Sequence, residues 1–333
     1  MPAGGHYSSR TAKNKHDEVT FVEVSPRDGL PLLCRGLSTE DKVNYINKLS
    51  ETGLTKIECA TFTHPRLLPA GYDAEKLIAG ISKKPSVTYV GLVPNEIGCR
   101  RAVITQLDEI LILLAASDIF NKINLGRTLK ETLNKMLPAI LNTANESGRS
   151  TRVYIMTAFG CPYTGVIPPP IIEELILKLS HMGVSEISLV DSTGMANPGT
   201  VRSIVGRLMD LRLDMNLAVH FHNTRGTAIA NCVAAYESGV RIFDTSLGGM
   251  SATPYGVEEL DFGYWNVPTE DLVHLFEEMG VSTGVDLDRL LDCVKLAEHM
   301  AGRSLPGHLL RARPASQIAA VPEHLTRRPL LDP

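Results

Sequence analysis

The sequence predicts an α/β fold of the (β/α)₈ type, a TIM barrel, on the basis of two observations. Short apolar runs rich in β-branched residues alternate with longer segments of helical periodicity, which is the pattern of parallel strands joined by crossover helices. No break in composition divides the 333 residues, so one closed barrel is favoured over a doubly wound sheet. The eight expected strands cover residues 19–24, 56–60, 87–92, 109–114, 152–157, 186–190, 217–220 and 241–245.

Capping residues mark the helices that connect these strands. The first expected helix begins at Ser38, has an acidic first turn and is closed by Gly53 in the C′ position. A last helix over residues 287–300 should pack on the barrel, and the Pro- and Arg-containing tail beyond it should be irregular. The other marked helices follow prolines 168–170 up to Gly183, begin at Asn197, and run from Thr269 to Gly280.

These elements divide the chain into three parts. Residues 19–284 form the expected catalytic barrel, and residues 285–333 form the C-terminal helix and tail packed on it. Residues 1–18 are expected to be a disordered leader. This leader carries several basic residues and little acid, so a short organellar presequence is the alternative.

Composition and charge exclude several classes of protein. The formal net charge of -4 lacks the basic character of a nucleic-acid-binding surface. No apolar run approaches the roughly 18 residues of a membrane span. The six cysteines contain no C-x-x-C pair, which favours reduced thiols. We therefore expect a cytoplasmic protein with no nucleic-acid partner and no membrane partner.

Polar residues follow the expected strands directly, where the reactive groups of such barrels lie. The turn that contains Arg27 and Asp28 would, taken alone, fit a salt-bridged loop. Its place after the first strand instead makes Asp28 a candidate metal ligand and Arg27 a candidate for stabilising an oxyanion. Glu58 and Asp191 end the second and sixth strands, and each fits either a catalytic role or a structural pairing with Lys or Arg. Asn95 and Ser117 follow the third and fourth strands.

The strongest local motif is the pair His220 and His222 at the end of the seventh expected strand. Residues i and i+2 of a strand point to the same side, so both imidazoles can bind one metal ion. An isolated pair of this kind is more often structural, but carboxylates at other strand ends favour a metal site. Two histidines, one carboxylate and an amide or water oxygen would suit Mg²⁺, Mn²⁺ or Co²⁺.

Two further segments are open to more than one interpretation. Cys161-Pro162-Tyr163 is typical of a rigid turn and could equally belong to the site. The long connection after the eighth strand contains the Gly248-Gly249 pair and Trp265, and we expect it to form a mobile lid.

Several short motifs occur along the expected barrel. They are VEVSPRDGL at 22–30, IE at 57–58, GCPYTG at 160–165, VDSTG at 190–194, AVHFHNT at 218–224 and NVPTED at 266–271. Together they resemble the hydroxymethylglutaryl-CoA lyases and their relatives among metal-dependent barrel enzymes, which include the isopropylmalate synthases. The resemblance covers roughly residues 19–284. Because independent motifs occur in the same order, the resemblance is specific.

The resemblance implies a role for each candidate residue. Arg27 would stabilise an enolate oxygen, and Glu58 and Asp191 would lie close to the substrate hydroxyl. The family also implies an acyl-CoA substrate and assembly as a homo-oligomer, a dimer. Asn266 is added by the resemblance alone, because the strand pattern does not select it. The implied ligands of a divalent metal ion are Asp28, His220, His222 and Asn266.

One departure from the family concerns its general acid. Lyases of this family carry a cysteine in a glycine-rich loop after the eighth strand, whereas the stretch GMSATPY at 249–255 places Thr253 there. A positioned general acid contributes about 10²–10⁴ in rate, and a Thr hydroxyl is a poor acid at neutral pH. Together with the apolar residues 31–33, this departure favours an acyl group other than hydroxymethylglutaryl.

The expected reaction is retro-Claisen cleavage of a 3-hydroxyacyl-CoA to acetyl-CoA and a keto acid, with the pKa of the substrate hydroxyl lowered by the bound metal. The same groups would also serve a metal-dependent aldolase or a Claisen-type acyltransferase acting on a keto acid. A third interpretation, suggested by the missing cysteine, is a catalytically silent metal-binding barrel.

Overall fold

The computed structural model describes residues 18–30, 36–64, 73–251 and 265–317. Several predictions fall outside these ranges. They concern the leader up to residue 17, the apolar residues 31–33, Thr253 with the middle of the expected lid, and the tail from residue 318 onward.

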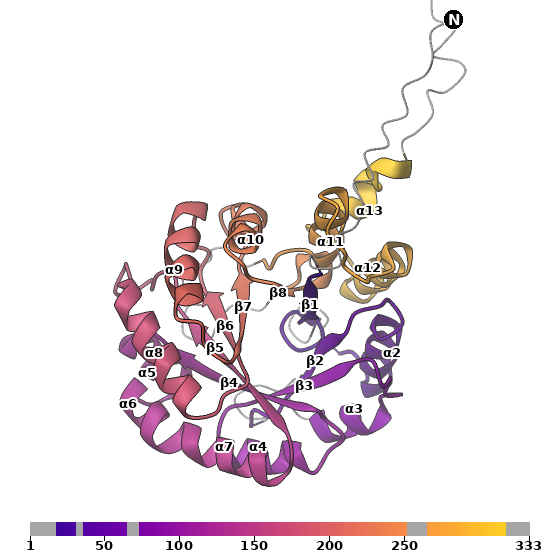
Figure 1. Ribbon diagram of the computed structural model, residues 1–333. Coiled ribbons are helices and arrows are strands. Elements are labelled where there is room, and N and C mark those ends of the chain that lie inside the picture. The colour runs from indigo at the N-terminus through magenta and orange to yellow at the C-terminus, as the bar shows by residue number, and fades with distance from the viewer. Residues whose placement is uncertain (1–17, 31–35, 65–72, 252–264, 318–333) are drawn as a thin grey trace, which may run out of the picture.

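Eight parallel strands close into a barrel in chain order, as the alternating pattern predicts (Figure 1). The first and last strands close the ring, with Thr20 opposite Ile242 and Glu23 opposite Thr245. Each strand end lies within two residues of its predicted position. The strands are β1 (Thr20–Glu23), β2 (Lys56–Thr61), β3 (Thr88–Val93), β4 (Glu109–Ala115), β5 (Ser150–Met156), β6 (Glu186–Asp191), β7 (Asn216–Phe221) and β8 (Ile242–Thr245).

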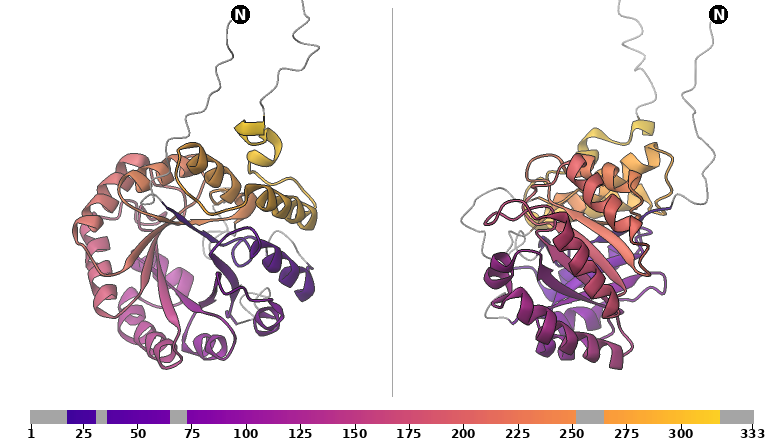
Figure 2. Two further views of the ribbon diagram at one scale, coloured as in Figure 1. Left: turned by 45° about the vertical axis from the view of Figure 1, so that its right-hand side comes forward. Right: turned by 60° about the vertical axis from the view of Figure 1, so that its left-hand side comes forward.

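The crossover helices form a ring outside the strands (Figures 1 and 2). Among the described residues, none of these helices is both long enough and apolar enough to cross a membrane. The helices are α2 (Thr39–Leu49), α3 (Ala74–Gly80), α4 (Glu96–Val103), α5 (Asp118–Leu125), α6 (Leu129–Glu131), the π-helical turn η2 (Thr132–Met136), α7 (Leu137–Glu146), α8 (Pro169–His181), α9 (Pro198–Asp210), α10 (Ala228–Glu237), the 3₁₀ turn η3 (Leu247–Gly249), α11 (Thr269–Glu278), α12 (Leu287–Ala301), α13 (Leu309–Ala312) and the 3₁₀ turn η5 (Ala315–Gln317).

Helix boundaries follow the predicted capping residues with one exception. Ser38 and Asn197 cap α2 and α9 through their side chains, as expected. Helix α2, however, ends at Leu49 and not at Gly53. Gly53 lies in the turn toward β2 with a φ of 89°, and a Cβ there would lie 2.2 Å from the carbonyl oxygen of Gly284. Both the backbone conformation and this close approach require glycine.

The apolar core lies between the strands and the ring of helices. Three buried phenylalanines join the closing strand pair to α11: the ring centroid of Phe276 lies 6.0 Å from that of Phe21 and 5.1 Å from that of Phe243. Aromatic contacts at these distances stabilise a core beyond simple burial of area. The five cysteines within the described ranges are free and buried.

The C-terminal part of the chain packs beside the barrel. Helix α12 confirms the helix predicted over residues 287–300, and it contacts α2 and α11. The tail beyond it is not irregular throughout, because it contains α13, which contacts α11 (Figure 2). The carboxylate of Asp271 accepts hydrogen bonds from the backbone N–H groups of His308 and Leu309. This contact satisfies amides that a short helix leaves unpaired, and the sequence pattern gives no sign of it.

A buried carboxyl group in α11 makes stability depend on pH. Burial raises the pKa of Glu270 to about 8, even though the backbone N–H of Gly248 donates a hydrogen bond to it. The ordinary pKa is 4.5, so unfolding releases a proton between about pH 4.5 and pH 8. The stabilisation from neutral Glu270 is fully present below this window. It is lost as the pH rises through the window, at roughly 1.4 kcal/mol per pH unit.

Glu270→Gln should therefore gain stability relative to the wild type as the pH rises toward 8, because the amide stays neutral in both the folded and the unfolded state. Urea denaturation followed by circular dichroism at several pH values measures this difference. Glu278→Gln, at an exposed position of the same helix, is the control. A constant difference between Glu270→Gln and the wild type across the window would show that the pKa of Glu270 is not raised.

Candidate metal centre

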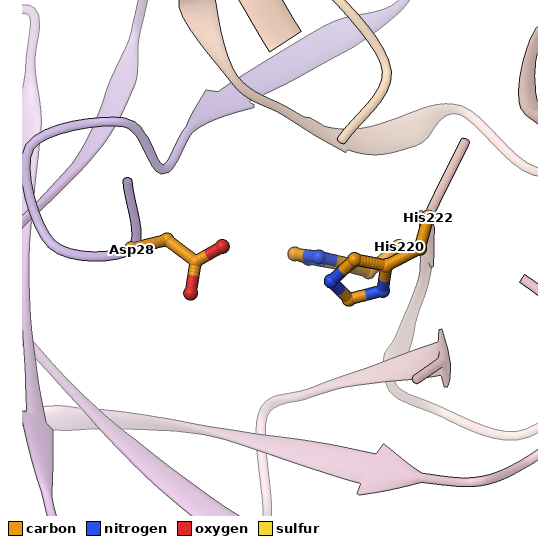
Figure 3. Close-up of side chains that lie close together, drawn as sticks. All are labelled: Asp28, His220 and His222. Carbon is orange, nitrogen blue, oxygen red and sulfur yellow. The ribbon is translucent and has the colours of Figure 1, made fainter. Parts of the chain in front are cut away.

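Three predicted ligands meet at the carboxyl ends of the strands. Asp28 lies in the turn after β1, His220 lies in β7, and His222 follows β7 directly. One potential ligand atom from each residue lies within 4.8 Å of the others. The carboxylate of Asp28 faces the two imidazole rings across the barrel mouth (Figure 3). The structure thus brings Asp28 to two histidines that follow it by 192 and 194 positions, since 220 minus 28 is 192 and 222 minus 28 is 194.

A hydrogen bond orients the ring of His222, and a nearby carboxylate faces the ring of His220. Nδ1 of His222 lies 2.9 Å from the carbonyl oxygen of Asp191, so it donates a proton there and Nε2 keeps its lone pair. Nδ1 of His220 lies 3.5 Å from the carboxylate of Asp244. A carbonyl or carboxylate partner behind the imidazole is the usual arrangement for a metal-ligating histidine.

Asn266 completes the cluster. Its Oδ1 lies 2.9 Å from Nε2 of His220, and its Nδ2 donates a hydrogen bond of 2.8 Å to Asp28. The backbone of Asn266 also forms an antiparallel bridge with His222. The structure therefore places Asn266 against all three predicted ligands. Asn266 could not be predicted from the residues that end or follow the strands, because it lies beyond the long connection after β8.

The charge states of these groups fit a divalent cation. Burial, followed by the neighbouring His220, lowers the pKa of His222 to about 4, which keeps its ring neutral and able to bind metal. Burial opposes ionisation of Asp28, but the positive charge of Arg27, together with the hydrogen bond from Asn266, holds the pKa of Asp28 below its usual value. One carboxylate, two imidazoles and an amide oxygen are a donor set for Mg²⁺, Mn²⁺ or Co²⁺.

Arg27 lies beside this cluster and is held by two carboxylates. Its Nη1 donates to Asp28 at 2.6 Å, and its Nε and Nη2 donate to Oε2 of Glu58 at 2.8 and 2.5 Å. The guanidinium carbon also lies 5.8 Å from the centre of the Tyr154 ring. Burial favours the neutral form of Arg27, but the two carboxylates reverse this and raise its pKa. Arg27 is therefore a fixed positive charge next to the candidate ligands.

Glu58 links Arg27 to a charged network inside the barrel. Its Oε1 accepts hydrogen bonds from Nη1 of Arg152 at 2.9 Å and from the hydroxyl of Tyr154 at 2.5 Å. With the two bonds from Arg27 on Oε2, Glu58 accepts four hydrogen bonds, which is about the capacity of one carboxylate. Glu58 is thus paired with two arginines, and its predicted catalytic role stays a prediction.

Arg152 joins three carboxylates in the centre of the barrel. Its side chain is fully buried, and it contacts Asp244 at 2.8 Å and Glu186 at 2.9 Å in addition to Glu58. Asp244 lies next to the predicted ligand His220, and Glu58 holds Arg27. The guanidinium of Arg152 therefore supports both His220 and Arg27, each through one carboxylate. Arg152 and Asp244 were not predicted, because the candidates were chosen among the polar residues that end or follow the expected strands. A charged residue inside an otherwise apolar strand is the signal that would have identified them.

Replacing Arg152 with Met should lower the free energy of unfolding by about 3–5 kcal/mol, because it leaves Asp244 buried without its arginine and takes one of two cations from Glu58 and from Glu186. Urea denaturation measures the change. Arg202→Met is the matched control: Arg202 forms an ion pair with Glu237 in which both side chains are 52% exposed, and we expect a loss of about 1 kcal/mol or less. Equal, small losses for both variants would contradict a stabilising network.

Asp191 is buried at the end of β6. Its two carboxylate oxygens accept hydrogen bonds from the backbone N–H groups of Met195 at 2.7 Å and Ala196 at 3.0 Å. Burial raises the pKa of Asp191 to about 6, and these backbone bonds partly offset the shift. Asp191 therefore shapes the turn after β6 and orients His222. Its predicted catalytic role stays a prediction.

The remaining strand-end residues have structural partners. Asn95 and Ser117 accept backbone hydrogen bonds as the N-caps of α4 and α5. Cys161 forms a backbone bridge with Gly165, which supports the turn interpretation of this segment. Of the expected lid, Gly248 and Gly249 form part of η3 and Trp265 adjoins Asn266.

Comparison with known sequences covers most of the chain. Residues 18–296 match the family described as HMGL-like. A hydroxymethylglutaryl-CoA lyase of Bacillus subtilis is 38% identical over 294 residues, spanning 88% of this chain and 97% of that protein. An (R)-citramalyl-CoA lyase of Chloroflexus aurantiacus is 35% identical over 321 residues, spanning 93% of this chain and 100% of that protein.

A solved structure agrees with the sequence comparisons. An HMG-CoA lyase from Acinetobacter baumannii, in complex with coenzyme A and 3-methylmalate, aligns with a TM-score of 0.86 and 34% identity. The alignment covers 93% of this chain and 99% of that one. The likeness therefore includes the C-terminal part as well as the barrel.

Proposed function

This chain belongs to the HMGL-like family, and on that basis we propose that it is a divalent-metal-dependent carbon–carbon lyase that cleaves a 3-hydroxyacyl-CoA to acetyl-CoA and a keto acid. The observation that carries the proposal is the cluster of Asp28, His220 and His222 with Arg27 directly beside it. A metal site next to a fixed cation suits a reaction in which negative charge develops on two oxygen atoms.

The residues of the cluster divide into ligands and supports. Asp28, His220, His222 and Asn266 would hold the ion, with Asp244 and the carbonyl of Asp191 keeping the two imidazoles in place. When bound, a divalent ion polarises substrate oxygens and makes the hydroxyl easier to deprotonate. Mg²⁺ and Mn²⁺ are the proposed ions, with Co²⁺ also suited to this donor set.

Arg27 would stabilise the enolate. Cleavage of the carbon–carbon bond next to the hydroxyl-bearing carbon leaves an electron pair that moves onto the thioester carbonyl oxygen. A guanidinium held in place by Glu58 needs no rearrangement to interact with that developing charge. The enolate carbon then takes up a proton to give acetyl-CoA.

Asp191 is a better candidate than Glu58 for accepting the hydroxyl proton. Glu58 already accepts four hydrogen bonds, from Arg27, Arg152 and Tyr154. Asp191 accepts one bond on each oxygen, and burial raises its pKa to about 6. A general base is most effective when its pKa lies near the working pH.

The acyl group is proposed to carry a carboxylate but to differ from hydroxymethylglutaryl. Thr253 stands where the family has its cysteine. The relatives include an (R)-citramalyl-CoA lyase and a lyase with bound 3-methylmalate, so the family accommodates more than one acid. Assembly as a homodimer is carried over from the family resemblance, and a cytoplasmic location stays a prediction.

The test is a product screen with the full-length protein. The protein is loaded with Mg²⁺ or Mn²⁺ and incubated with 3-hydroxyacyl-CoA thioesters that include hydroxymethylglutaryl-CoA and citramalyl-CoA. Mass spectrometry then follows release of acetyl-CoA. We expect release from at least one thioester, and its loss when EDTA removes the metal. No release of acetyl-CoA from any of the thioesters, or release that EDTA does not affect, would overturn the proposal.

A further inference from the structure

We propose that the segment of residues 303–309, here called the C-terminal strap, positions the metal ligand Asn266 by holding both ends of the β8–α11 connection. The inference rests on the proposed metal site, and it assigns a functional role to a part of the chain outside the barrel. The strap follows α12 and leads into α13 (Figure 1).

The strap first contacts the connection at η3. The backbone N–H of Gly307 donates to the carbonyl of Gly248 at 3.2 Å. A Cβ added at Gly248 would lie 2.5 Å from the Leu305 side chain, and one at Gly249 would lie 3.1 Å from Pro306. Both glycines have positive φ, 64° and 76°. The side chains of Leu305 and Pro306 therefore pack directly against the backbone of η3, at a distance that residues larger than glycine would prevent.

The strap also holds the far end of the connection. Asp271 accepts hydrogen bonds from the N–H of His308 at 3.0 Å and of Leu309 at 2.8 Å, and it lies 2.8 Å from the imidazole Nδ1 of His308. The guanidinium of Arg303 lies 5.5 Å from the ring centre of Trp265. Trp265 directly precedes Asn266, so these contacts flank the ligand on both sides in the sequence.

Asn266 depends on the segment that the strap holds. Its backbone N–H donates to the carbonyl of Gly249 at 3.0 Å, and its Nδ2 donates to the carbonyl of Met250 at 3.0 Å. The strap thus contacts the backbone of residues 248–250, and that backbone in turn accepts hydrogen bonds from Asn266. A group that orients a metal ligand in this way contributes to metal affinity, and its loss typically costs about 10–100-fold.

Glycine at position 307 is required for this contact. A Cβ at Gly307 would lie 1.9 Å from Oε1 of Glu270, the buried carboxyl group that accepts a hydrogen bond from Gly248. A side chain at 307 would therefore displace either the strap or the carboxyl group of Glu270, which itself accepts the hydrogen bond from Gly248 of η3. The same substitution at Gly206 in α9 meets no atom within 4 Å, which makes it a matched control.

The experiment compares Mn²⁺ binding by the full-length wild type, Gly307→Ala and Gly206→Ala, using isothermal titration calorimetry. We expect Gly307→Ala to weaken Mn²⁺ affinity by about 10-fold or more, and Gly206→Ala to match the wild type. Trp265 is the single tryptophan of the chain, so a change in intrinsic fluorescence of Gly307→Ala would report movement next to Asn266. A thermal melt distinguishes a local effect from general unfolding.

A second variant tests the strap without a steric clash. Arg303 and His308 are exposed, so Arg303→Ala combined with His308→Ala removes two anchors and leaves the core intact. We expect this variant to melt near the wild-type temperature and to bind Mn²⁺ more weakly. Wild-type affinity in both strap variants would overturn the role of the strap and leave the lyase proposal standing. A wild type that binds no Mn²⁺ would overturn both.

Discussion

Arg27→Met is expected to lower kcat on the acyl-CoA substrate by about 10²–10³-fold, the usual cost of removing one group that stabilises an oxyanion. The physical reason is that Met cannot neutralise the enolate oxygen that forms when the carbon–carbon bond breaks. Metal affinity should not fall, because the substitution removes a cation that lies beside the ligand Asp28. Steady-state kinetics and Mn²⁺ titration separate the two effects.

Arg27→Lys and Arg100→Met serve as the comparisons. Lys keeps the charge but not the planar fork that reaches Glu58 and Asp28 together, so an intermediate loss of kcat is expected. Arg100 forms an exposed ion pair with Glu96, and its replacement should leave kcat unchanged. If Arg27→Met kept wild-type turnover, Arg27 would have no part in the chemistry.

His220→Ala should abolish metal-supported turnover, with a loss of at least about 10³-fold. A metal ion acting on substrate oxygens contributes several kcal/mol to stabilising the transition state, and each ~1.4 kcal/mol is a factor of ten in rate. Removing His220 takes away one imidazole and also deprives Asp244 and Asn266 of a contact. EDTA should inactivate the wild type, and added Mn²⁺ should restore the wild type but not the variant.

His181→Ala controls for loss of an imidazole elsewhere, because His181 is exposed on α8. Full turnover and metal binding are expected of that variant. Turnover by His220→Ala at the wild-type rate would remove this residue from the ligand set.

The metal ligands that end or follow strands could be predicted from the sequence, because a parallel barrel brings the carboxyl ends of all its strands to one face. That rule found Asp28, His220 and His222, whose ligand atoms the structure brings within 4.8 Å. Asn266 needed the family resemblance, since its place depends on how the connection after β8 folds back.

The charged residues that hold the ligands and Arg27 in place could not be predicted in this way. Arg152 pairs with Glu58 across 94 positions and with Asp244 across 92. No local periodicity reveals which interior charges will meet when the barrel closes. The end of α2 and the helix α13 were missed for a related reason. Both depend on contacts between distant segments, Gly53 with Gly284 in one case and Asp271 with Leu309 in the other.

The charged interior of the barrel has a consequence for how the chain can fold. Lys56 of β2 pairs with Glu109 of β4 and Glu186 of β6, and Glu186 in turn pairs with Arg152 of β5. A fragment that ended after β4 would contain Glu58 without Arg152, and a fragment that began at β5 would contain Glu186 without Lys56. Glu58 would keep only Arg27, and Glu186 would keep only Arg152, so each half would lack one of the two cations that stabilise its buried carboxylate. The interior carboxylates therefore meet all their cationic partners only when the ring is complete, and we expect the barrel to unfold as a single cooperative unit.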